Sequence, residues 1–134
     1  RQQALRGPRG GVPVFSEWIH DMHGFPTTAS RGGWAKLFPS AVPRDSGEVA
    51  RMRSAGGVVL GKTAADDFAY HGNGTSSLSG QVRNPYDRAG VKTPGGSSAG
   101  TAVSVACGIA FAGLGTDDGG SNRITAPFCG VVRM

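Results

Sequence analysis

The sequence predicts an α/β fold, because two helical patterns each lead directly into a short apolar run. The first helical pattern spans residues 45–57 and precedes the apolar run 58–60. The second is centred on residues 102–106, ends at Gly108, and precedes the run 109–114. A helix followed by a strand is the repeating unit of layered α/β domains, so the two units together favour this class.

Composition limits the size of the core and the classes of partner. A chain of 134 residues fits one domain, and 23 glycines with 38% apolar residues predict a thin core. The net charge of +5 comes from basic residues spread along the chain, which favours a solvated surface over a nucleic-acid interface. Neither a membrane-spanning run nor a signal-peptide pattern is present in the sequence, so we expect no membrane association and a cytoplasmic protein.

Cysteine usage gives no metal or disulfide pattern. Cys107 and Cys129 lie in apolar surroundings without further ligands at metal-binding spacing. We expect both to be reduced core residues, and we expect the chain to need neither a metal nor another cofactor.

The N-terminal third is predicted to contain a short strand and long loops. Residues 1–11 are basic and polar and are expected to form a loop. A strand is expected over 11–15 and a turn over 24–28. Residues 29–44 are predicted to be a loop anchored to the core by the apolar side chains Trp34, Leu37 and Phe38.

The middle of the chain carries clearer helix signals. Asp45 or Ser46 is placed to cap the first helix, and Gly56-Gly57 to end it. Thr63 is expected to cap another short helix, with Asp66 three residues later and with Phe68 and Tyr70 facing inward. Residues 71–93 are rich in glycine, asparagine and serine and predict turns, and residues 131–134 are expected to begin another strand.

Two glycine turns, each bearing serine, flank the second helix. The first turn spans residues 95–100 and the second residues 117–121, so that Ser97 and Ser121 are 24 positions apart. Glycine allows positive φ angles and a close approach of the backbone to a ligand. The second turn is suited to directing several backbone N–H groups at one point, which is the geometry of an oxyanion or phosphate site.

These turns resemble the core motif of the amidase signature family, serine hydrolases that cleave carboxamides. The resemblance is carried by GGSSAGTAVSVACG and GLGTDDGGSNRITAPFCGVV and extends over nearly all of residues 7–132. It implies a layered α/β/α core around a mixed sheet, with residues 1–134 forming part of an amidase signature domain. Family members usually continue beyond this region, so the chain is expected to be truncated.

The resemblance also implies a role for individual residues. Ser121 corresponds to the nucleophile, and Ser97 to the serine that follows a cis glycine–serine peptide bond and links the nucleophile to a lysine base. The backbone N–H groups that would form the oxyanion hole are those of Asp118, Gly119, Gly120 and Ser121. The supporting positions are Ser98, Thr116, Asp117 and Arg123.

The sequence departs from the family pattern at the lysine. The stretch GVPVFSEW resembles the family segment in which the lysine comes six residues after the glycine, and that position is Glu17 here. An ordinary carboxylate is a weak base at neutral pH, so Glu17 would serve only if burial raised its pKa substantially. Glu17 is expected to be negatively charged at neutral pH, and activity is therefore expected to be weak or absent.

Two other motif matches fail on their context. GGVVLGKT, residues 56–63, satisfies the P-loop pattern, but a helix precedes it and its variable residues read as a strand. Residues 96–100 satisfy the nucleophile-elbow pattern with Ser98, but all three histidines lie earlier in the chain and Pro94 stands where a strand is needed.

The predicted function is hydrolysis of a carboxamide C–N bond in a small-molecule amide. The alternatives are an amidotransferase subunit that supplies ammonia for tRNA-dependent amidation, and a noncatalytic piece of such a protein. The identity of the amide and the oligomeric state are not determined by these motifs.

Overall fold

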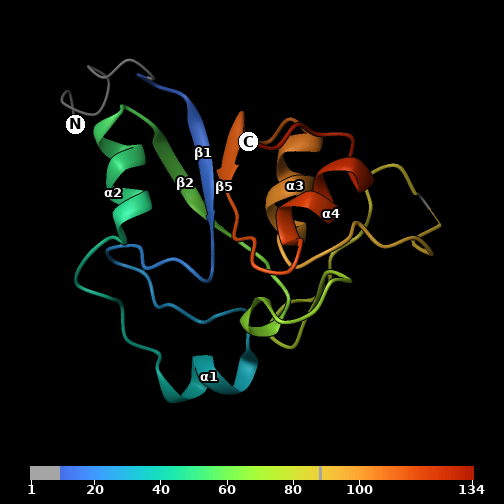
Figure 1. The fold of residues 1–134 in the computed structure, drawn as a ribbon. Helices are drawn as coiled ribbons and strands as arrows, with labels where there is room; N and C mark the ends of the chain where they lie inside the picture. The colour runs from blue at the N-terminus through green and yellow to red at the C-terminus, as the bar shows by residue number, and fades with distance from the viewer. Residues whose placement is uncertain (1–9, 88) are drawn as a thin grey trace.

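A parallel three-stranded sheet lies at the centre of the computed structural model, which describes residues 10–87 and 89–134. Strand β1 (Pro13–Glu17) is the middle strand, between β2 (Val58–Thr63) and β5 (Ala112–Leu114) (Figure 1). Glu17 is paired with Thr63 on one side of β1, and Ser16 with Leu114 on the other. The carboxyl ends of the strands therefore meet at one edge of the sheet.

Helices lie on both sides of this sheet. Helix α2 (Gly47–Ser54) is on one side, and α3 (Ala99–Ala106) and α4 (Ser121–Phe128) are on the other (Figure 1). The chain passes from β1 through α2 to β2, and then from β2 through α3 to β5 on the opposite side of β1. The two connections run in opposite directions across the sheet, so right-handed crossovers place α2 and α3 on opposite faces. The predicted α/β class is confirmed. The central strands pair in parallel, and the antiparallel pairing expected of a mixed sheet occurs in a separate pair, β3 (Thr75–Ser76) with β4 (Gly80–Gln81).

Helix α2 follows its sequence signals. The Ser46 side chain accepts a hydrogen bond from the Val49 backbone N–H, as expected of an N-cap, and Gly56 ends the helix with a φ of 93°. Val49 is fully buried, which fixes the apolar side of the helix against the sheet.

Small residues allow α3 to pack closely on the sheet. A Cβ atom on Gly113 of β5 would lie 2.5 Å from the Thr101 methyl group, and one on Gly100 would lie 2.6 Å from the Ala64 carbonyl oxygen. Neither position has room for a side chain. Of the two cysteines expected in the core, Cys129 is buried but Cys107, which caps the end of α3, is exposed.

The predicted loop over residues 29–44 contains a helix, α1 (Gly32–Leu37). The Trp34 ring of this helix lies 4.1 Å from the Phe38 ring and 5.5 Å from the Phe68 ring. Trp34, Leu37 and Phe38 are 37%, 74% and 52% exposed, so the prediction that they anchor this segment to the core is wrong. The apolar side chains of this segment do not identify in the sequence which part of the protein they contact.

The helix expected after Thr63 is also different. Thr63 is the last residue of β2, and only a short 3₁₀ turn, η2 (Asp67–Ala69), follows. Phe68 and Tyr70 are exposed, contrary to the prediction. The Asp66 side chain makes no capping bond and instead accepts the backbone N–H of Asn73.

Three further differences concern the second half of the chain. Strand β5 begins at Ala112 and not at Ile109, and Ile109 and Phe111, which were expected in a buried strand, lie on the surface. Helix α4 was not predicted, since Pro127 and the preceding glycines disguise its eight residues. Residues 131–134 form no strand, and most of the loop predicted over 1–11 lies outside the described residues.

No helix in the part of the chain that the structure describes is long and apolar enough to span a membrane.

Met22 is the largest of the fully buried side chains, at 1% exposure. We expect Met22→Ala to lower the free energy of unfolding by about 2–5 kcal/mol, because it removes buried apolar contacts and leaves a cavity. Urea denaturation followed by circular dichroism measures the change. The matched control is Met134→Ala, whose side chain is exposed. Equal stability changes in the two variants would contradict the assigned core.

Candidate active site

The candidate site lies at the carboxyl edge of the parallel sheet. Glu17 ends β1, and the loop after β5 passes beside it before α4 begins at Ser121. The turn before α3 brings Ser97 to the same place. Ligand sites of open α/β sheets occur at this edge, because the loops after the strands converge there.

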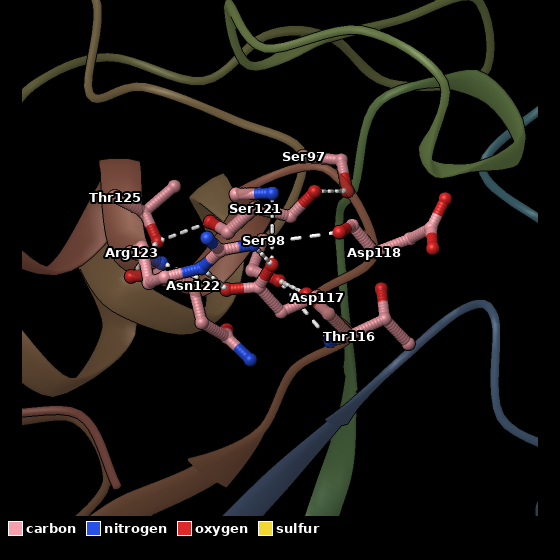
Figure 2. Close-up of polar contacts among 10 residues, drawn as sticks. Ser97, Ser98, Thr116, Asp117, Asp118, Ser121, Asn122, Arg123 and Thr125 are labelled. Atoms are coloured by element: carbon pink, nitrogen blue, oxygen red, sulfur yellow. Dashed lines mark hydrogen bonds and ion pairs between the residues drawn. The ribbon is translucent and has the colours of Figure 1, made fainter.

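The two predicted serines are in direct contact. The Ser97 hydroxyl donates a hydrogen bond of 2.9 Å to the Ser121 hydroxyl, and Figure 2 shows the two side chains pointing toward one another. Ser97 is fully buried and Ser121 is 8% exposed. The Gly96–Ser97 peptide bond is cis, as the family resemblance predicts.

Ser121 is held at the first turn of α4. Gly120 precedes it with a φ of 128°, a conformation that favours glycine. The Thr125 hydroxyl donates 2.7 Å to the Ser121 carbonyl oxygen within the same helix. A helix start presents unpaired backbone N–H groups and the positive end of the helix dipole, which favour negative charge beside Ser121.

An ion pair fixes the loop that leads to Ser121. The Asp117 carboxylate accepts the Arg123 Nη2–H at 2.8 Å, the Arg123 Nε–H at 3.0 Å and the Gly120 backbone N–H at 2.8 Å (Figure 2). Hydrogen bonds from Arg123 hold the pKa of Asp117 well below its usual range. The two residues therefore remain ionised and close the 117–123 loop.

The predicted oxyanion donors are not equivalent. The Gly120 N–H is donated to Asp117, so it is already occupied. Within the described residues, the backbone N–H groups of Asp118, Gly119 and Ser121 have no acceptor. Asp118 and Gly119 are exposed, which leaves their N–H groups accessible to a ligand beside Ser121.

Ser98 links the first serine turn to Thr116, the residue before the second turn. Its hydroxyl donates to the Thr116 carbonyl oxygen at 3.0 Å and accepts the Thr116 backbone N–H at 3.2 Å. A Cβ atom on the neighbouring Gly115 would lie 2.7 Å from the Ser98 hydroxyl and would also collide with the Asn122 side chain. Only glycine therefore fits at position 115 while Ser98 keeps its hydrogen bonds to Thr116.

Glu17 is buried beneath the same loop. Its Oε2 atom accepts the Thr116 backbone N–H at 3.1 Å and the Thr116 hydroxyl at 3.0 Å, whereas Oε1 is buried without a hydrogen-bond partner. Burial raises the pKa of Glu17 from 4.5 to about 7, although the polar groups of Ser98, Thr116 and Thr101 around the carboxyl oppose the rise. The expectation that Glu17 is fully ionised at neutral pH is therefore wrong, because protonated and ionised forms coexist there.

The structure brings Glu17 close to the supporting residues but not into a hydrogen bond with Ser97. Its hydrogen bonds come from the backbone N–H and the hydroxyl of Thr116. Lys36 is exposed on α1 and does not take the lysine position. His20 bonds Ser16, which faces the opposite side of β1 from Glu17 because neighbouring strand residues alternate.

Asp66 is a buried carboxylate at the site that sequence reasoning assigned to a helix cap. It is fully buried, and its backbone N–H donates to the Ser97 carbonyl oxygen at 3.1 Å. The position of this acidic residue shortly after the strand 58–60 expected from the sequence was the one local feature that could have indicated a role at the site. Across the described ranges 10–87 and 89–134, no group of three or more His, Cys, Asp or Glu side chains could hold a metal ion.

The raised pKa of Glu17 predicts a pH-dependent stability. The folded-state pKa of about 7 exceeds the ordinary value of 4.5, so the favourable contribution of neutral Glu17 is complete below pH 4.5 and is lost as pH rises through 7. The loss corresponds to about 3 kcal/mol. We expect Glu17→Gln to remove this dependence between pH 5 and 8, measured by urea denaturation at each pH. Glu48→Gln, at an exposed glutamate on α2, should retain the parent's slope; parallel curves for parent and Glu17→Gln would contradict the assignment.

Comparison with known proteins identifies related sequences along nearly the whole chain. The family model described as Amidase matches residues 1–132. A glutamyl-tRNA(Gln) amidotransferase subunit of Syntrophobacter fumaroxidans is 42% identical over 127 residues, which cover 95% of this chain and 25% of that protein. The subunit of the same name from Nitratidesulfovibrio vulgaris is 44% identical over 128 residues, with 95% and 25% covered. The chain thus spans about a quarter of the length of these curated relatives.

Solved structures share the fold. The corresponding glutamyl-tRNA(Gln) amidotransferase subunit from Thermotoga maritima gives a TM-score of 0.82 at 35% identity, over 92% of this chain and 26% of that one. The peptide amidase of Stenotrophomonas maltophilia gives 0.79 at 36% identity, over 91% and 25%. With the family model matching residues 1–132, the chain belongs to the amidase family.

Proposed function

We propose that this chain carries the nucleophile-bearing core of an amidase-type enzyme that cleaves the C–N bond of a small-molecule carboxamide. The observation that carries the proposal is the 2.9 Å hydrogen bond between Ser97 and Ser121 at the start of α4. A buried serine pair beside free backbone donors suits acyl transfer, because it supplies a nucleophile, a proton path and an anion site together.

In the proposed reaction, Ser121 Oγ attacks the carbonyl carbon of the amide. For this step the hydrogen bond between the two hydroxyls is reversed, so that the Ser121 proton passes to Ser97 Oγ while Ser97 releases its own proton to a base. The carbonyl oxygen becomes an oxyanion and accepts the N–H groups of Asp118, Gly119 and Ser121, while the Asp117–Arg123 ion pair fixes their loop. The amine leaves with a returned proton, and water then hydrolyses the Ser121 ester to a carboxylic acid.

Glu17 is the candidate base of this chain. Its pKa of about 7 lies in the range suited to proton transfer at neutral pH, so its ionised form accepts a proton and its protonated form returns one to the amine. Two features limit it: its hydrogen bonds go to Thr116 instead of Ser97, and its protonated form carries no positive charge. General-base assistance is worth about 10²–10⁴ in rate, so we propose slow turnover with most of that factor missing.

The nucleophile assignment predicts selective labelling. We expect a fluorophosphonate probe to modify Ser121, because its hydroxyl lies beside the free N–H groups that would stabilise the adduct. Peptide mapping by mass spectrometry locates the label. Ser121→Ala should abolish labelling, and Ser40→Ala, at an exposed loop serine, should leave it unchanged. Modification of Ser98 with Ser121 intact would refute the assignment and revive the nucleophile-elbow alternative.

Glu17 gives a gain-of-function prediction. Glu17→Lys should raise hydrolysis of a simple arylamide by about 10²-fold or more, because a lysine restores a base able to become cationic. The matched control is Glu48→Lys, which makes the same charge change on the surface of α2. Circular dichroism must first show that both variants are folded, since Thr116 loses its carboxylate acceptor. Equal rates in folded parent and Glu17→Lys would remove position 17 from the mechanism.

A second candidate function is supply of ammonia to an amidotransferase. The observation that favours it is that the curated relatives described above are named as subunits of glutamyl-tRNA(Gln) amidotransferase. Both functions begin with attack of Ser121 on a carboxamide, so the labelling experiment does not separate them. Turnover of varied primary amides by the chain alone would favour the hydrolase, whereas ammonia release that depends on a charged tRNA acceptor would favour the amidotransferase.

A further inference from the structure

Asp66 is a buried carboxylate that the proposed reaction does not use. It is fully buried and lies between β2 and the η2 turn. Its Oδ2 atom accepts the Asn73 backbone N–H at 3.0 Å, and backbone N–H groups of Gly74 and Thr75 also face the carboxylate. One side chain thus gathers the 72–75 loop around it.

The same residue contacts the first serine turn in two ways. Its backbone N–H donates to the Ser97 carbonyl oxygen at 3.1 Å. Its Oδ2 atom occupies the space where a side chain on Gly96 would lie, and a Cβ atom there would also be 2.7 Å from the Asn73 nitrogen. The 72–75 loop, Asp66 and the Gly96–Ser97 turn are therefore packed without space between them.

The electrostatic setting of Asp66 is unusual for a purely structural acid. Its Oδ1 atom is buried without a hydrogen-bond partner, and burial raises the pKa of the carboxyl group although the backbone N–H groups oppose the rise. The adjacent Asp67 has separate partners, Arg31 and Ser77, and does not duplicate its contacts.

We propose that Asp66 is a positioning residue that holds the Gly96–Ser97 turn where Ser97 reaches Ser121. The backbone N–H fixes the Ser97 carbonyl group, and the carboxylate fills the space behind Gly96 and ties it to the 72–75 loop. The inference deepens the proposed function and rests on it for the role of Ser121, but the positioning itself is a property of the fold.

The test compares Asp66→Ala with Asp66→Asn. Alanine removes the acceptor for the 72–75 loop, whereas asparagine keeps an oxygen for the Asn73 N–H at nearly the same volume. We expect Asp66→Ala to raise amide hydrogen exchange in segments 72–75 and 95–98 at least about tenfold, the effect of losing one buried hydrogen bond. Labelling of Ser121 by the fluorophosphonate should fall about 10²-fold in the same variant, since small misplacements of reacting groups have effects of this size. In Asp66→Asn, both the hydrogen exchange of these segments and the labelling of Ser121 should be closer to the parent's values than in Asp66→Ala.

Val49→Ala is the control for general destabilisation, because Val49 is buried on α2, on the other side of the sheet. It should lower the melting temperature without selectively exposing segments 72–75 and 95–98. Parent-like exchange in Asp66→Ala would overturn the inference, and so would a labelling loss no larger than that of Val49→Ala. If the parent is not labelled at Ser121, the proposed nucleophile fails, and the exchange data alone decide whether Asp66 positions the turn.

Discussion

The site depends on one constraint, the parallel pairing of β1 with both of its neighbours. Parallel pairing places the carboxyl ends of all three strands at one edge. The residues at and after the strand ends must then share a small space, which brings Glu17, Thr116 and Ser121 together although Glu17 and Thr116 are 99 positions apart in the sequence. Helix α3 supplies the remaining part, because it starts at this edge and places Ser97 beside Ser121. No single segment of the chain contains the site.

Close approach of backbones is the second requirement. Positions 96, 113 and 115 each lack room for a Cβ atom, and the neighbouring atoms belong to Asp66, Thr101 and Ser98. The glycine content that suggested a thin core therefore has a particular use at these positions. At 96 and 115 it allows loops to pack closely around the serines, and at 113 it allows β5 to pack closely on α3. The interior that results is rich in hydroxyl groups, and Ser97, Ser98, Thr101, Ser121 and Thr125 are all buried. Such an interior is stabilised by specific hydrogen bonds more than by apolar area.

The sequence predicted those features that depend on a short stretch of neighbouring residues. The cap and glycine stop of α2, the spacing of the serine turns and the cis bond before Ser97 all follow from short motifs or from the family resemblance. What it did not predict depends on contacts between distant segments. The pKa of Glu17 depends on its burial, and the role of Asp66 depends on the 72–75 loop. Trp34 stays exposed because the aromatic rings that it contacts, Phe38 and Phe68, are themselves on the surface. Helix α4 was missed because its stability comes from its position against α3, while its own eight residues include a proline.

The short sheet has a consequence for handling the protein. Within the described residues, β2 and β5 are each hydrogen-bonded to a neighbour on one side only. An unpaired strand edge is a template on which another strand can add, and the exposed side chains of Leu60 and Phe111 make these edges attractive to other copies. A charged side chain on either outer strand would make such addition less favourable.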